Sequence, residues 1–177
     1  MKEKKPFTER VVTELVKSGI CSVEESKNII KTFEESTITY FDAFLLEEAL
    51  VDRVQLLKIL AKVYATPAFD VKGYFFDHEL LLLFPKDFLM ENVFIPLKTD
   101  DETLFIIMND PENFDVVETI GNYVSYNVEI QVGLSEDIEE AIEEYYNLDI
   151  VSGSMEDEDE EDGEEESMED MDIVDFM

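Results

Sequence analysis

The chain has 177 residues, 45% of them hydrophobic and 11% aromatic, which suits one ordinary domain or two small ones that share a core. Its 45 acidic and 13 basic residues give a net charge of -32, and every basic residue lies at or before Lys98. Residues 99–177 carry 29 acids and no base. This half repels nucleic acid and anionic membranes, so we expect no nucleic-acid partner.

The sequence also bears on the compartment. It opens Met-Lys-Glu-Lys-Lys-Pro, without the apolar stretch of a signal peptide. The longest apolar run, Leu80–Phe84, is far too short to cross a bilayer. A single cysteine, Cys21, forms no internal disulfide and fits a reducing compartment. We therefore expect a cytoplasmic protein with no membrane insertion.

Two helix pairs are predicted over residues 8–65. The first helix ends at Gly19, because glycine readily takes the left-handed conformation just past a helix end. The second begins at Ser22, with Glu25 placed to complete a capping box. The third follows, and the fourth opens at Asp52, another capping residue.

The two pairs resemble each other after a shift of 30 residues. The shift superimposes Leu15 on Leu45, Gly19 on Ala49, Ile20 on Leu50 and Ile30 on Leu60. The match suggests a duplicated helix hairpin. Chance agreement between two amphipathic hairpins explains it equally well.

After Pro67 the hydrophobic period changes from helical to strand-like. The expected elements are short helices at 77–84 and 86–90, a β-hairpin of strands 93–97 and 103–108, a helix that starts at Asp110-Pro111 and runs to Val124, a strand at 127–132 and a last helix capped by Ser135. We therefore predict an α+β fold. Its parts are a helical subdomain (1–66), an α+β subdomain (67–150) and a disordered acidic tail (151–177).

A catalytic constellation is not apparent in the sequence. The one histidine, His78, has no nucleophile near it in the predicted helix, and Cys21 has no neighbouring base. These two residues are too few for a zinc site, and no glycine-rich phosphate loop is present. We expect no catalytic residue, no metal and no cofactor.

Five motifs occur in order between residues 64 and 142. They are Tyr64-Ala-Thr-Pro67, Leu82-Leu-Phe-Pro85, Val93-Phe-Ile-Pro96-Leu97, Leu104-Phe-Ile-Ile-Met-Asn-Asp110-Pro111 and Val132-Gly-Leu-Ser-Glu136-Asp-Ile138-Glu-Glu-Ala141-Ile142. In this order they resemble the N-terminal, MshEN-like domain of the type II secretion and type IV pilus assembly ATPases. The resemblance covers roughly residues 8–147 and implies a helical part joined to a small α+β part.

The resemblance also implies a following ATPase domain, where this sequence has an acidic tail. A domain standing alone acts by binding, so we expect a non-catalytic adaptor or regulatory module that docks onto a secretion or pilus motor or a related regulator. Two alternatives stay open. One is a cyclic di-GMP receptor with a degenerate motif, and the other is an acidic chaperone or nucleic-acid mimic.

Members of the family that bind cyclic di-GMP carry two tandem copies of a motif of arginine, glycine and leucine. Arg10, Leu15, Gly19 and Ile30 fit the first copy and are weak nucleotide-binding candidates. The departures lie at positions where the family contacts the ligand. Val12 and Phe33 replace a glycine and the glutamine of the first copy, and Tyr40, Asp42, Ala49 and Val63 replace the arginine, both glycines and the glutamine of the second. We therefore expect a small-molecule ligand to be absent or weakly bound.

The end of the tail differs from the rest of it. Apolar residues recur there between acids, at Met168, Met171, Ile173, Val174, Phe176 and Met177. Wound into a helix, they would form a soft apolar stripe suited to a groove with a basic rim, which makes them partner-binding candidates. The alternative is a solubilising tail.

Overall fold

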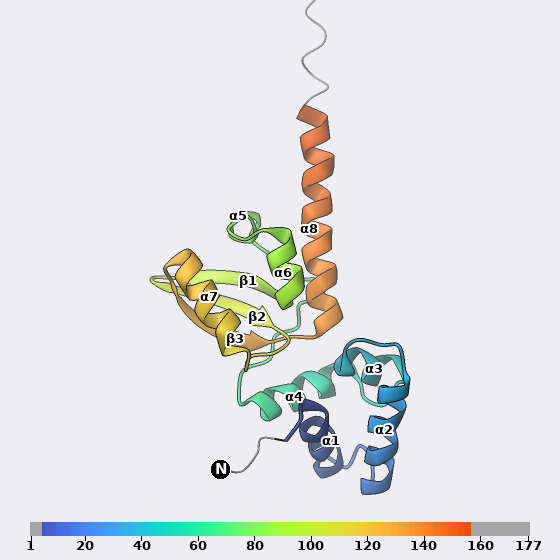
Figure 1. Ribbon diagram of the computed structural model, residues 1–177. Coiled ribbons are helices and arrows are strands. Elements are labelled where there is room, and N and C mark those ends of the chain that lie inside the picture. The colour runs from blue at the N-terminus through green and yellow to red at the C-terminus, as the bar shows by residue number, and fades with distance from the viewer. Residues whose placement is uncertain (1–4, 157–177) are drawn as a thin grey trace, which may run out of the picture.

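A computed structural model describes the backbone of residues 5–156 and the side chains of residues 5–148. The chain forms two parts (Figure 1). The first contains α1 (Phe7–Lys17), α2 (Val23–Glu35), α3 (Phe41–Glu47) and α4 (Arg53–Tyr64). These are the two helix pairs predicted from the sequence, and the predicted α+β class is confirmed.

The two helix pairs turn in the same way. Gly19 has a φ of 73° and Ala49, 30 residues later, a φ of 52°, so both take the left-handed conformation that follows a helix end. The matching hydrogen bonds run from the Ile20 N–H to the Leu15 carbonyl and from the Leu50 N–H to the Leu45 carbonyl, both 3.0 Å. The repeat seen in the sequence is therefore also a repeat of local geometry.

The starts of the second helix of each pair agree as well. The Ser22 hydroxyl accepts from the Glu25 N–H at 3.2 Å, and the Glu25 carboxylate accepts from the Ser22 N–H at 2.7 Å, which completes the predicted capping box. Asp52 accepts from the Gln55 N–H at 2.8 Å. Each such cap contributes about 1 kcal/mol to helix stability.

The second part is built on a three-stranded sheet of order β1-β2-β3. Its elements are α5 (His78–Leu81), α6 (Lys86–Asn92), β1 (Phe94–Asp100), β2 (Thr103–Met108), α7 (Phe114–Val124), β3 (Asn127–Val132) and α8 (Ser135–Glu156). Strands β1 and β2 pair antiparallel, and β2 and β3 pair parallel through the crossover helix α7. Both the hairpin and the parallel crossover were predicted.

Several boundaries differ from the sequence expectation, since the helix expected at 77–84 is only His78–Leu81 and the first strand runs on to Asp100. Val93 is not in the first strand but ends α6 in the left-handed conformation, with a φ of 45°. Helix α7 begins at Phe114 instead of Pro111. The Asp110 carboxylate accepts from the Glu112 N–H at 3.1 Å, which closes a turn between residues 110 and 112. Asp110 therefore forms a turn before α7 instead of capping its first turn.

A further difference is at the end of α8, which continues to Glu156, beyond the boundary expected at residue 150. The packed first turns of α8 have already met the cost of starting the helix. Each further residue then adds one backbone hydrogen bond, which explains the added turns. Figure 1 shows α8 rising from the junction of the two parts and projecting past the sheet. Residues 157–177, including the apolar end of the tail, lie outside the described residues.

The two parts are joined by backbone hydrogen bonds and by packed side chains. The linker after α4 runs beside the end of β3, where the Val132 N–H donates to the Pro67 carbonyl and the Phe69 N–H donates to the Val132 carbonyl, both at 2.9 Å. Val132 and Leu134 are buried in the core of the helical part. The cores of the two parts meet here, and side chains of α3 and α4 bond to the start of α8.

Candidate functional site

A cleft of about 320 Å³ lies at the junction of the two parts. Its walls come from α1, the α2–α3 connection and α4 on one side, and from the segments that follow β2 and β3 on the other. The lining includes aromatic rings and several charged or polar groups. Among them are Arg10, Tyr40, Asp42, Tyr64, Glu112 and Ser135.

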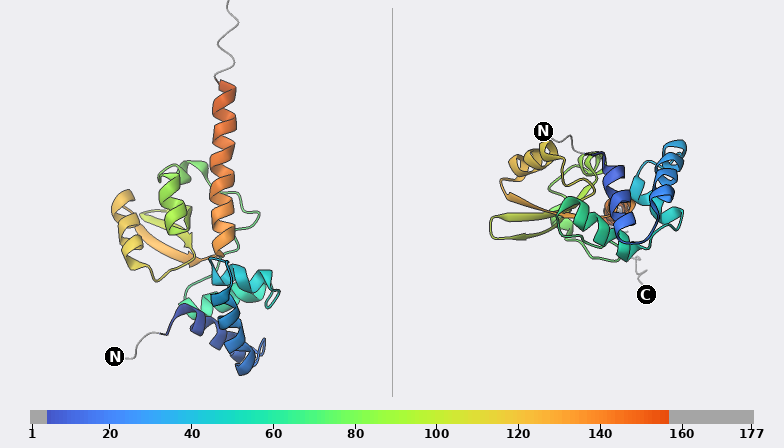
Figure 2. Two further views of the ribbon diagram at one scale, coloured as in Figure 1. Left: turned by 45° about the vertical axis from the view of Figure 1, so that its right-hand side comes forward. Right: turned by 90° about the horizontal axis from the view of Figure 1, so that it is seen from below.

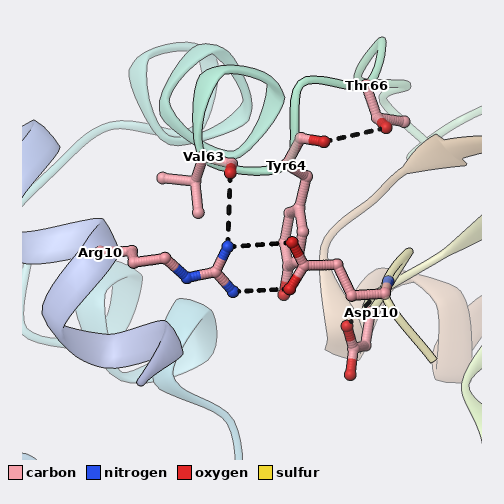
Figure 3. A network of polar contacts seen from close by, with 6 residues as sticks. Arg10, Val63, Tyr64, Thr66 and Asp110 are labelled. Atoms are coloured by element: carbon pink, nitrogen blue, oxygen red, sulfur yellow. Dashed lines mark hydrogen bonds and ion pairs between the residues drawn. The ribbon is translucent and has the colours of Figure 1, made fainter. Parts of the chain in front are cut away.

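Arg10, the nucleotide candidate of α1, reaches across this junction. Its guanidinium donates to both carboxylate oxygens of Glu112, at 3.0 and 2.8 Å, and its Nη1 lies 3.5 Å from the Val63 carbonyl oxygen (Figure 3). The pair is bidentate and about four-fifths buried, the geometry in which arginine binds a carboxylate most strongly. The Nε of Arg10 is buried without a hydrogen-bond partner among the described residues.

Tyr64 completes the surroundings of the guanidinium, whose central carbon lies 5.5 Å from the centre of the ring. That is within the range of a cation–π contact. Burial raises the pKa of the Tyr64 hydroxyl and the Asp110 carboxylate adds to the rise, while Arg10 opposes it. The ring therefore stays neutral and supplies a face to Arg10 instead of a charge.

Asp42, at the start of α3, is the most buried acid at the junction. It accepts from the Ser135 N–H at 2.7 Å and from the Ser135 hydroxyl at 2.9 Å. It thereby satisfies a free donor at the N-terminus of α8. Burial raises the pKa of Asp42, and the bonds from Ser135 oppose the rise without overcoming it.

Two further side chains tie the helical part to α8. The Tyr40 hydroxyl donates to Glu139, and the Arg53 guanidinium donates to Asp137. Arg10 and Tyr40 are 30 residues apart, so equivalent positions of the two helix pairs each donate to a glutamate of the α+β part. The polar groups of the junction are thus used to join the two parts.

The structure separates the four nucleotide candidates. Only Arg10 reaches the junction cleft. Leu15 is fully buried in the helical core, Gly19 forms the turn after α1, and Ile30 packs at the edge of the same core. Glu112 and Ser135 were missed as partners. The signal for Glu112 in the sequence is its place directly after Asp110-Pro111, a pair that also favours a helix start.

Other candidate chemistry finds little support. Burial raises the pKa of the Cys21 thiol and Glu25 adds to the rise, which disfavours a thiolate nucleophile. Across the described residues 5–156, no group of three or more His, Cys, Asp or Glu side chains is arranged to hold a metal ion. No helix in this range is long and apolar enough to cross a membrane.

Comparison with known proteins defines the class. Residues 64–151 match the MshEN domain, so the chain carries an MshEN domain in this segment. The type IV pilus assembly ATPase PilB of Myxococcus xanthus (strain DK1622) is 26% identical over 132 residues, which are 75% of this chain and 23% of that protein. The chain therefore spans less than a quarter of the length of this relative.

Two solved structures share the fold. MshE, solved with cyclic di-GMP, superimposes with a TM-score of 0.61 at 21% identity, covering 81% of this chain and 100% of that one. The N-terminal domain of XpsE gives a TM-score of 0.55 at 19% identity, covering 79% of this chain and 96% of that one. The helical part and the MshEN segment together thus have the architecture of these N-terminal domains.

Proposed function

We propose that this chain is a non-catalytic, cytoplasmic protein-binding module that docks onto a secretion or pilus motor or a related regulator. The observation that carries the proposal is the bidentate bond between Arg10 and Glu112. The guanidinium of Arg10 is the cation that this chain retains from the nucleotide-binding motif, and the bond pairs it with the carboxylate of Glu112. The matches to N-terminal domains, and not to a catalytic ATPase domain, support the same function.

Absence of nucleotide hydrolysis is part of this proposal. A phosphate-release assay on the purified full chain should give no turnover of ATP or GTP. Turnover that follows the protein through successive purification steps would contradict the proposal.

Docking is tested by capture from the native host. The full chain should retain a motor or regulator of the secretion or pilus type, and the same bait without residues 168–177 should lose it while keeping its melting temperature. Capture should weaken as salt rises, because part of the contact is charge pairing. Full retention by the truncated bait would reduce the end of the tail to a solubilising segment.

A second candidate function is that of a cyclic di-GMP receptor. It is favoured by the fold shared with MshE, solved with that ligand, and by the presence of Arg10 in the junction cleft. In this case Glu112 competes with the ligand for the guanidinium. Glu112→Gln keeps the shape of the side chain and removes its charge, so this variant should bind cyclic di-GMP more tightly than the wild type. Equal or weaker binding by the variant would count against a ligand at Arg10.

A further inference from the structure

A second hollow, of about 510 Å³, lies on the outside of the molecule between α8 and the loop of residues 70–77. We refer to it as the outer groove. In the left view of Figure 2 this loop runs beside the lower half of α8. The α8 side of the groove is one stripe of the helix, spaced by three and four residues: Asp137, Glu140, Ala141, Glu144, Tyr145 and Leu148.

The loop that forms the other wall is held in place. The Phe76 N–H donates to the Tyr145 hydroxyl, and the Phe76 ring is buried against the main core. The Tyr74 ring packs edge-on against Phe76 and Phe69, with ring centres 4.8 and 5.1 Å away. Gly73, with a φ of 75°, allows the tight turn closed by the bond from the Tyr74 N–H to the Val71 carbonyl.

Phe75 projects from this fixed loop and is 91% exposed. Leu148 across the groove is 60% exposed and Tyr74 is 42% exposed. Both neighbours of Phe75 are anchored, so its exposure does not come from a loosely packed segment. Aromatic side chains presented on a rigid support are the usual anchors of protein interfaces.

The charge of the groove decides what fits it. Asp137 is engaged by Arg53, whereas Glu140 and Glu144 are exposed on the same wall, one helical turn apart. Lys72 is the basic residue among the lining side chains. An occupant therefore needs an apolar face for Phe75 and Leu148 and cations for the two glutamates. The acidic tail of this chain, with 14 acids and no base in residues 151–177, has the wrong charge.

We propose that the outer groove is a docking surface for a basic amphipathic segment of a partner protein. The inference rests on the proposed binding function and names the surface and the chemistry of the partner. Phe75 is the apolar anchor, and Glu140 and Glu144 set the preference for a basic face.

The test uses two short helical peptides, one of leucine and lysine and one of leucine and glutamate, each with a fluorescent label. The full chain should bind the lysine peptide and not the glutamate peptide. Phe75→Ala should weaken binding of the lysine peptide about tenfold or more, as loss of an interface anchor does. The double variant Glu140→Gln/Glu144→Gln should weaken it about threefold, and this loss should shrink as salt rises.

A matched control is available on α7, where Phe114 is 69% exposed and Glu118 is exposed one turn later. Phe114→Ala and Glu118→Gln remove the same chemical groups from another surface and should leave the affinity unchanged. The acidic tail is common to all variants, so unspecific attraction of the lysine peptide cancels in the comparison. A photo-crosslinker on the peptide should label the 70–77 loop and α8.

Equal affinity of the wild type and the Phe75→Ala variant, an equal loss in the α7 control, or crosslinks elsewhere would overturn the inference. None of these results touches the proposed function, which is judged by capture from the host. Conversely, a chain that captures no partner and still binds the lysine peptide through Phe75 would contradict the proposed function and leave the groove assignment standing.

Discussion

Helix α8 contributes to both the junction cleft and the outer groove, and its side chains are engaged at its start and exposed farther along. At the start of α8, Ser135, Asp137 and Glu139 all bond to the helical part. Farther along, the same helix exposes Leu148 beside the projecting ring of Phe75. Size and polarity alone therefore do not make a hollow a binding site. What matters is whether its groups are already engaged within the chain.

Of the substitutions considered, replacement of Asp42 should reduce stability the most. Asp42→Ala leaves the N–H and the hydroxyl of Ser135 without their acceptor in a buried position, and should lower the free energy of unfolding by about 2–3 kcal/mol. Phe75→Ala in the outer groove should change it by less than about 0.5 kcal/mol, as surface substitutions do. Urea unfolding of the two variants measures both. Similar losses in the two would remove the distinction between the cleft and the groove.

The ion pair between Arg10 and Glu112 should have the next largest effect. Arg10→Ala should cost about 1–2 kcal/mol, because the pair is bidentate and mostly buried. A double-mutant cycle of Arg10→Ala and Glu112→Ala should give a coupling of about 1 kcal/mol. The same cycle for the exposed pair Lys31 and Glu35, 3.9 Å apart, is the control and should give less than about 0.5 kcal/mol. Equal couplings would mean that Arg10 does not hold the junction together.

A smaller effect concerns pH. Burial raises the pKa of Asp42 above its ordinary value of 3.8, so the folded state prefers the protonated carboxyl. The stability from this group is present in full below 3.8 and is lost as pH rises through the raised pKa. Asp42→Asn keeps the shape and does not titrate, so the wild type should lose stability relative to this variant as pH rises above 3.8 and through the raised pKa. Urea unfolding of both proteins across the acidic to neutral range measures this difference, and a difference that does not change with pH would contradict the raised pKa of Asp42.

Local signals made most of the fold predictable. Gly19, the Ser22–Glu25 capping box and Asp52 each act within a few residues of themselves, so the sequence alone located these three helix ends. The strands at 103–108 and 127–132 were bounded correctly, because the apolar period changes at both ends.

The junction could not be predicted in the same way. The side-chain hydrogen bonds between its two parts join residues that lie 84 to 102 positions apart, such as Arg10 with Glu112 and Arg53 with Asp137. Whether Glu112 faces Arg10 depends on the turn at Asp110, and an Asp-Pro pair suits a turn as well as a helix start. The sequence indicated that Arg10 matters and that position 42 carries a charge. The sequence did not indicate that Arg10 would bond to the carboxylate of Glu112, or Asp42 to the N–H of Ser135.

The guanidinium of Arg10 is engaged within the chain, and we propose that the protein acts through its outer surfaces instead. The most direct test is calorimetric titration of the full chain with cyclic di-GMP. We expect no measurable binding or only weak binding, because several ligand contacts of the family motif are replaced and each is worth roughly 1–3 kcal/mol. A submicromolar dissociation constant that is lost in Arg10→Ala would contradict the claim and make the chain a nucleotide receptor.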